Sequence, residues 1–180
     1  MIDYLLVKGH IGGANFWAYP VRFKSDKTED IQDPVADRDI GITTDEESCE
    51  FFLWHFLVKY FDGKLLYNRF RELCCNGEEV EFEWYLTDNY YPRDTIKTML
   101  ADIGRFTADL EKNGLDAVFA EIKDDRGFGS CYGHSIAKVS REELEEYRAT
   151  AIEYYRRFVQ YMNDMLESGP DYPYISFQGP

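Results

Sequence analysis

Apolar and polar residues alternate most regularly at positions 79 to 86, where the sequence reads EVEFEWYL. The apolar positions fall on one side of an extended chain: Val80, Phe82, Trp84 and Leu86. The other side carries Glu79, Glu81, Glu83 and Tyr85. Because side chains alternate across a strand with a period of two, this pattern predicts a strand with one face on the core and one in water. Trp84 is therefore expected in the core and Glu83 at the surface.

Two shorter runs near the N-terminus also have the character of strands. Residues 3–8 read DYLLVK and residues 15–24 read NFWAYPVRFK, with the glycine-rich GHIGG between them. Apolar runs joined by a short glycine-containing loop predict a β-hairpin. Residues 25–43 have little periodicity and many acids, so they are expected to form a loop.

A helix is predicted over residues 45–61. Thr44 opens the sequence TDEE, which has the form of a capping box, and a run that is apolar on nearly all sides follows it. A helix with so small a polar face is buried on several sides or lies in an interface. A shorter helix is expected over residues 65–74, and residues 115–123 favour a helix over a strand.

Two longer helices follow from apolar stripes with helical spacing. The first is predicted over residues 94–112, where Asn113 and Gly114 end it. The second begins at the capping box SREE and continues to Ser168. The tail YPYISFQGP is too rich in aromatic residues to be assumed disordered.

These elements combine into an α+β fold. We expect a small, mainly antiparallel sheet, formed by the N-terminal hairpin and residues 79–86, packed against three or four helices with a long C-terminal helix. The alternation at 79–86 favours a sheet with one open face, and too few strand–helix pairs occur for a doubly wound parallel sheet. A chain of 180 residues is expected to form a single domain, residues 1–180.

The net charge of the chain indicates which classes of partner it is expected to bind. The chain has 34 acidic and 20 basic residues, a net charge of −14. More than half of it arises in residues 26–50, where ten acids accompany only Lys27 and Arg38. Nucleic acid and anionic membranes both require a basic surface, so neither is an expected partner. A basic protein would be attracted, although acidity that serves only solubility remains an alternative.

The expected location and cofactors of the protein follow from signals that the sequence lacks. No apolar run approaches the roughly 20 residues of a membrane span, and the N-terminus lacks the pattern of a signal peptide. Cysteines 49, 74, 75 and 131 show no CxxC spacing. We therefore expect a cytoplasmic protein with reduced thiols, no disulfide, no metal and no cofactor.

One short motif suggests catalysis. Residues 129–133, GSCYG, have the form of a nucleophile elbow centred on Cys131. Such an elbow requires a helix directly after it and a base from elsewhere, whereas here a loop follows and the base would be the adjacent His134. Cys131 and His134 also have the spacing of half a zinc site, without a second pair. A small thiol-dependent hydrolase or transferase centred on Cys131 is therefore the alternative function.

Three longer motifs carry a resemblance to known proteins: FEWYLTDNYYPRDTIKTMLADI (82–103), YYRRFVQYMNDML (154–166) and ISFQGP (175–180). They resemble a group of small uncharacterised bacterial proteins with an F-E-W strand, an aromatic corner, a Y-R-R-F long helix and an I-S-F-x-G-P tail. The resemblance spans the last hundred residues or so and implies no catalytic residue. Acidic proteins of this size and type are often immunity or antitoxin-like partners of secreted toxins.

Together these observations predict an acidic protein-binding module, most simply an immunity protein that neutralises a basic, toxin-like partner by direct binding. The predicted docking residues are Glu79, Glu81, Glu83, Asp33, Asp37 and Asp39. Long-range attraction by these acids would steer association, and the many Tyr and Trp residues would supply anchors. A homodimer through the apolar helix at 45–61 is a further alternative.

Overall fold

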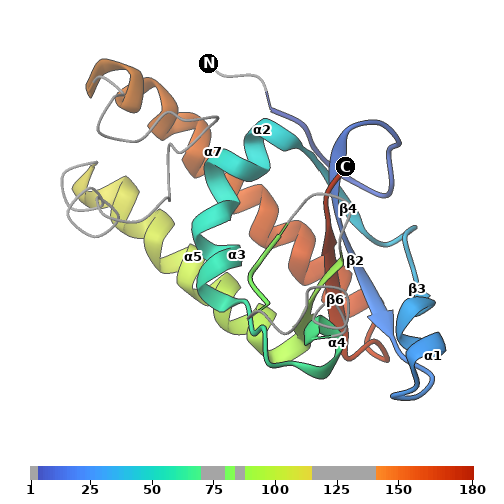
Figure 1. The fold of residues 1–180 in the computed structure, drawn as a ribbon. Coiled ribbons are helices and arrows are strands. Elements are labelled where there is room, and N and C mark those ends of the chain that lie inside the picture. The colour runs from blue at the N-terminus through green and yellow to red at the C-terminus, as the bar shows by residue number, and fades with distance from the viewer. Residues whose placement is uncertain (1–3, 70–79, 84–87, 115–140) are drawn as a thin grey trace.

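The computed structural model describes residues 4–69, 80–83, 88–114 and 141–180. Within these residues, six strands form one antiparallel sheet, and the long helices cover one of its faces, so the predicted α+β class is confirmed (Figure 1). The strand order is β1-β4-β2-β6-β5, and β3 also pairs with β2. The strands are β1 (Leu6–Lys8), β2 (Asn15–Arg22), β3 (Val35–Ala36), β4 (Ile42–Asp45), β5 (Asp88–Pro92) and β6 (Tyr174–Gln178).

The described helices differ greatly in length. They are α1 (Thr28–Gln32), α2 (Glu46–Ser48), the π-helix η1 (Cys49–Leu53), α3 (Trp54–Tyr60), α4 (Leu66–Arg69), α5 (Arg93–Asn113) and α7 (Arg141–Ser168). The long helices α5 and α7 pack against each other and against the sheet, as the apolar stripes predict. None of the described helices combines the length and the apolarity needed to cross a bilayer.

The predicted N-terminal hairpin is wrong, because β4 lies between β1 and β2. Thr44 of β4 is the register partner of Leu6 on one side and of Phe16 on the other. Residues 25–43, predicted as a loop, contain α1, β3 and the start of β4. These elements have two to five residues each, too few to establish a periodic pattern.

The helical cap lies one residue later than the TDEE motif suggests. Thr44 is a buried strand residue, and Asp45 accepts a hydrogen bond from the backbone N–H of Ser48 at 2.8 Å. The helix predicted over 45–61 then forms as three consecutive segments, α2, η1 and α3. Most of its aromatic and aliphatic side chains are buried in the core of the same chain.

The strand predicted over 79–86 is also wrong in the part that the structure describes. Residues 80–83 belong to no strand, and the ladder strand is β5, which begins at Asp88. The alternation nevertheless holds, because Glu81 and Glu83 are exposed while the Phe82 ring packs against the core. Trp84 and Glu79 lie outside the described residues.

A side-chain amide holds residues 80–83 where strand pairing does not. The Asn89 amide donates to the carbonyl of Glu83 at 2.6 Å and accepts from the N–H of Glu83 at 3.3 Å. The same amide donates to the carbonyl of Phe177 in β6 at 3.1 Å. Asn89 is fully buried, so these bonds satisfy its polar atoms inside the protein.

A second buried amide closes the outer edge of β5. The Asn68 amide accepts from the N–H of Tyr90 at 2.8 Å and donates to the carbonyl of Tyr90 at 2.9 Å. It also donates to the carbonyl of Asp62 at 2.8 Å. Because an open strand edge invites pairing with other chains, Asn68 protects β5, and Pro92 ends the strand without an N–H to offer.

The two long helices cap each other. Arg93, at the start of α5, donates to the carbonyls of Leu166 and Gly169 at the C-terminal end of α7. Arg148 of α7 donates in turn to the carbonyls of Leu110 and Glu111 near the end of α5, each at 2.9 Å. Both arginines therefore donate to carbonyl groups that a helix end leaves unpaired. Their positive charges also interact favourably with the negative end of the helix dipole.

Asn68→Ala should lower the free energy of unfolding by about 1–3 kcal/mol, because it leaves buried backbone groups of Tyr90 unpaired. Asn68→Asp should also destabilise, since it loses both donated bonds. Denaturant unfolding measures the effect, with the exposed Asn163→Ala on α7 as the matched control, expected to change stability by less than about 0.5 kcal/mol. Equal effects at the two positions would contradict the edge-closing role.

Candidate docking surface

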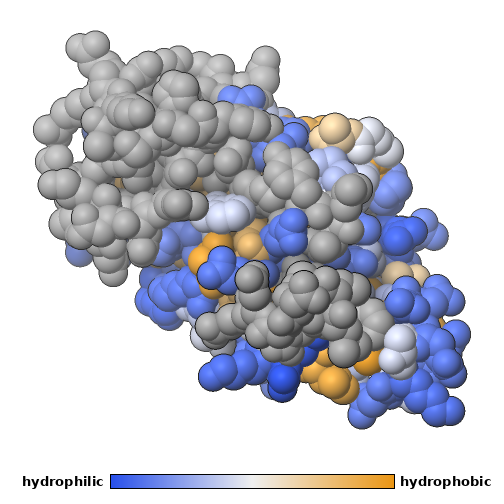
Figure 2. Space-filling model, in the orientation of Figure 1, coloured by the Kyte–Doolittle hydropathy of each residue, from blue (hydrophilic) through white to orange (hydrophobic). Residues whose placement is uncertain are grey.

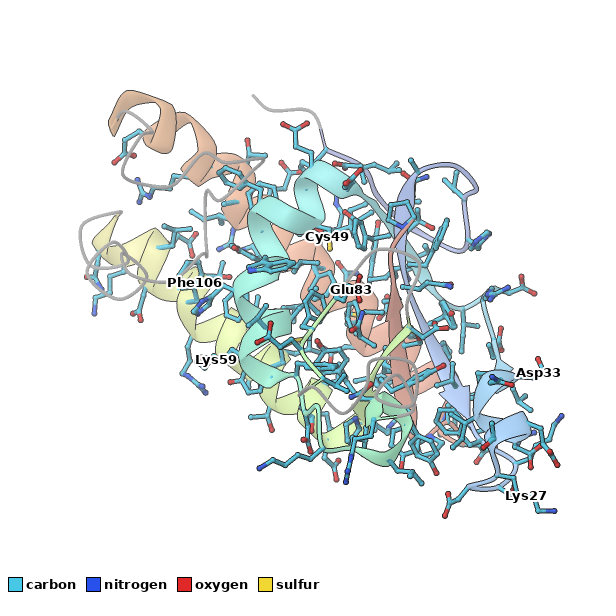
Figure 3. The ribbon with its side chains drawn as sticks, viewed as in Figure 1. Lys27, Asp33, Cys49, Lys59, Glu83 and Phe106 are labelled. Carbon is cyan, nitrogen blue, oxygen red and sulfur yellow. The ribbon has the colours of Figure 1, made fainter. Side chains whose placement is uncertain are left out.

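The structure places the predicted docking acids in two groups. Asp33, Asp37 and Asp39 lie together on the chain between α1 and β4, whereas Glu81 and Glu83 lie in the segment before β5. Figure 3 shows the labelled Asp33 beside α1 and the labelled Glu83 well away from it, near the middle of the view. Glu79 lies outside the described residues. The three aspartates thus share one surface segment of the chain, and the two glutamates belong to another.

The aspartates belong to a larger set, which we name the acidic corner: Asp26, Glu29, Asp30, Asp33, Asp37 and Asp39. The buried side chain of Ile31 anchors α1 to the molecule, so the acids around it face outward. Ser25 donates a hydrogen bond to Asp30, and the N–H of Asp39 donates to the Asp37 carboxylate at 3.2 Å. In Figure 2 the part of the molecule occupied by α1 is predominantly hydrophilic.

No acid of the corner takes part in an ion pair within the described part of the chain. The ion pairs that join two described residues all involve a residue of α3, α5 or α7. Asp102 of α5 is an example. Burial acts to raise its pKa, but hydrogen bonds from Lys59 and Tyr60 outweigh burial and hold that pKa below its usual range. The helices therefore neutralise many of their acids, whereas the corner does not.

An aromatic patch adjoins the acidic corner and consists of Phe23, Tyr67 and Tyr174. The rings of Phe23 and Tyr67 stack with centroids 3.7 Å apart, and Tyr174 meets Tyr67 edge-on at 5.0 Å. All three side chains are half-buried and come from three different parts of the chain. The Tyr67 hydroxyl donates to Asp26 at 2.9 Å, and burial together with this bond raises the pKa of Tyr67. The patch is thus tied directly to the corner.

The face of the sheet that points away from α5 and α7 is named the outer face. A polar cluster lies on it. The hydroxyls of Tyr19 and Ser176 both donate to Oδ1 of Asp88, at 2.7 and 2.6 Å. The Gln178 amide lies 3.0 Å from the Tyr19 hydroxyl, and the Arg38 guanidinium lies 5.1 Å from the centre of the Tyr19 ring. Burial and the Asp88 carboxylate raise the pKa of Tyr19 to about 12.

The hydroxyls of this cluster are engaged with the Asp88 carboxylate. Ser176 is fully buried and its hydroxyl is directed at Asp88, so it is not available as a nucleophile. The hydroxyl–carboxylate bonds join β2, β6 and β5 and hold the Asp88 carboxylate in one position. A carboxylate fixed in this way can accept a cationic group with little further loss of side-chain freedom.

The thiol chemistry suggested by the sequence concerns Cys131 and His134, which lie outside the described residues. Cys49 is a buried thiol that takes part in no disulfide. Among the described residues, no three or more His, Cys, Asp or Glu side chains are grouped so that they could hold a metal ion.

Comparisons of the chain with protein-family models, with curated proteins and with solved structures found no match. The resemblance drawn from the three sequence motifs therefore stays an expectation.

Sequence patterns did not single out Tyr19, Asp88 or Ser176. Asp88 lies 69 residues from Tyr19 and 88 residues from Ser176 along the chain. Only strand pairing brings them together, so no local spacing announces the cluster. The grouping of Asp33, Asp37 and Asp39, in contrast, is local and could be read directly from the sequence.

The Tyr19 hydroxyl should stabilise the fold in a pH-dependent way. Because its pKa is raised from 10.0 to about 12, its contribution should be complete below pH 10 and be lost between pH 10 and 12. Tyr19→Phe should therefore remove one late step from the ultraviolet titration of the tyrosines. Tyr172→Phe provides the control, and loss of a step near pH 10 from Tyr19→Phe would contradict the raised pKa.

Proposed function

We propose that the protein is an acidic binding module that holds a basic protein partner at the acidic corner and the adjoining aromatic patch. In this proposal it works in the cytoplasm as an immunity protein, which neutralises a toxin-like partner by direct binding. The observation that carries the proposal is the corner itself, whose acids form no ion pair in the described structure although ion pairs are frequent on the helices.

The charge of the corner suits long-range attraction. Unpaired acids on one side of a molecule create a negative potential that is screened over about 10 Å at 0.1 M salt. Complementary charge raises the rate of encounter and suppresses wrong partners more than it raises affinity. Lys27 and Arg38 lie within the same segment and reduce the potential without neutralising it.

The aromatic patch suits short-range attachment. Residues that contribute most to binding are often Tyr, Trp and Arg in the centre of an interface, surrounded by polar side chains. Tyr67 and Tyr174 are half-buried, so each presents part of a rigid ring beside the acids. Leu66, on the same short helix as Tyr67, is 48% exposed and adds apolar surface. A basic partner could thus bury aromatic area while its Lys and Arg side chains pair with the corner.

Glu81 and Glu83 form a second, separate position for docking. They are exposed, but they lie apart from the corner and make contacts of their own. The two groups of acids can therefore be tested independently of each other.

Association of the protein with its partner should be slowed when the corner is reversed in charge. The partner to test is the product of a neighbouring toxin-like gene, mixed with the protein in stopped-flow experiments at several salt concentrations. Asp33→Lys with Asp39→Lys should reduce the association rate about tenfold or more at low salt, with a smaller change in dissociation. Asp37 is kept, because its carboxylate holds the turn at Asp39.

Two double variants with the same change of charge serve as comparisons. Glu81→Lys with Glu83→Lys tests the second position, and Asp109→Lys with Glu167→Lys places the same charges on exposed sites of α5 and α7. The corner variant should reduce the association rate most, and the differences in association rate between the variants should become smaller as the salt concentration rises. A partner whose association ignores both salt and the corner reversal would refute docking at the corner.

A further inference from the structure

The outer face of the sheet carries three residues in one row across the neighbouring strands β2, β6 and β5: Trp17, Gln178 and Asp88. Gln178 is the register partner of both other residues. Directly opposed residues share a face, and neighbouring strands lie about 4.8 Å apart, so the row spans about 10 Å. All three side chains are half-buried, so each is held in place and still reaches the surface.

Asp88 supplies the negative charge of the row. The hydroxyls of Tyr19 and Ser176 both donate to the same oxygen of its carboxylate, Oδ1. No basic side chain in the described part of the chain forms an ion pair with it. A half-buried carboxylate has lost part of its hydration, so a cationic group brought to its free oxygen Oδ2 gains more than it would at an exposed acid.

Gln178 can add an acceptor beside that oxygen. The carbonyl oxygen of Gln178 lies 3.0 Å from the Tyr19 hydroxyl, whose shorter bond, at 2.7 Å, goes to Oδ1 of Asp88. A carbonyl oxygen has two lone pairs, so this oxygen can accept a further hydrogen bond. Because Gln178 is the register partner of Asp88, the acceptor stands next to the carboxylate.

Trp17 supplies an aromatic wall. Its indole N–H donates to the carbonyl of Ile11 at 2.9 Å, and the His10 ring stacks on the indole with centroids 4.9 Å apart. These contacts fix the orientation of the ring. Tryptophan is the most favourable aromatic partner of a cation. The neighbouring Tyr19 ring already has the Arg38 guanidinium over it, so this part of the surface accommodates a guanidinium group within the same chain.

We propose that the row of Trp17, Gln178 and Asp88, the arginine socket, receives one arginine side chain of the basic partner. The inference rests on the proposed function, because that function supplies the basic partner. The guanidinium donates to Oδ2 of Asp88 and to the Gln178 carbonyl, while the rest of the side chain lies across the Trp17 indole. A planar fork of donors fits two adjacent acceptors, whereas the compact ammonium of lysine does not span them equally well. The socket therefore selects arginine over lysine.

Two peptides of equal charge provide the test. Fluorescence anisotropy at low salt measures binding of labelled octa-arginine and octa-lysine to the full chain. We expect octa-arginine to bind about tenfold more tightly, a difference of about 1.4 kcal/mol. Asp88→Asn should lower the affinity for octa-arginine about tenfold and leave the affinity for octa-lysine within about twofold.

The variants separate the socket from charge and from folding. Asp88→Asn keeps an oxygen that accepts from Tyr19 and Ser176, so its thermal unfolding should stay close to that of the parent protein. Gln178→Leu provides a second variant that should also reduce the preference for arginine. Asp109→Asn makes the same change of charge at an exposed site on α5 and should leave the preference intact.

The remaining variant tells failure of the socket from failure of the docking surface. Asp33→Asn with Asp39→Asn should weaken both peptides alike. Suppose this variant weakens both peptides. The socket is then overturned, and the acidic corner stands, if the parent protein binds the two peptides equally or if Asp88→Asn weakens both alike. If neither peptide binds at low salt, the proposal of a basic partner falls and the socket falls with it.

Discussion

The position of the C-terminal strand is the constraint on which the other features depend. β6 pairs with β2 along one edge and with β5 along the other, so the end of the chain joins the N-terminal half of the sheet to its last strand. Ile175 and Phe177 enter the core formed with α5 and α7, while Ser176 and Gln178 alternate onto the outer face. Without β6, the long helices would lose the core contacts of Ile175 and Phe177, and the row across the outer face would not exist.

The hydroxyl groups of four tyrosines have different hydrogen-bond acceptors on the two sides of the sheet. On the core side, Tyr91 and Tyr155 donate to the carbonyls of Leu57 and Phe52, and these bonds fix the apolar helix at 46–60 in the core. On the outer side, Tyr19 and Tyr67 donate to carboxylates, so each places a negative charge at a defined point. A buried tyrosine needs a partner for its hydroxyl; Tyr91 and Tyr155 find backbone carbonyls in the core, whereas Tyr19 and Tyr67 find carboxylates on the outer side.

Features that depend on local sequence could be predicted, and features that depend on distant pairing could not. The helices at 93–113 and 141–168 repeat their apolar stripe over many turns, so periodicity alone identifies them. β4 could not be predicted from its own sequence, because it has only four residues and is stabilised by pairing with β1 and β2 on either side. Gly41 just before it shows the same dependence, since a Cβ there would lie 2.7 Å from the carbonyl oxygen of Ala18.

Residues 79–86 illustrate how a correct pattern can lead to a wrong element. Alternation reports which side chains reach the core, and Phe82 does pack there, but it does not report whether the backbone joins a ladder. Here the amides of Asn89 and Asn68 take the backbone bonds that another strand would have made. The docking acids show a similar limit, because the composition of the chain reveals its acidity but not which acids the helices neutralise.

The acidic corner and the arginine socket act over different distances, and this difference determines what each contributes to binding. The corner lies at the surface, where its charges are felt before contact and are screened by salt, so its contribution is to encounter. Asp88 is half-buried, and its oxygen becomes useful only when a donor reaches hydrogen-bond distance, so its contribution is to the lifetime of the complex. A basic partner without a suitably placed arginine would therefore still be attracted but would leave quickly. Selection among basic proteins thus lies with the socket, because net charge alone cannot distinguish them.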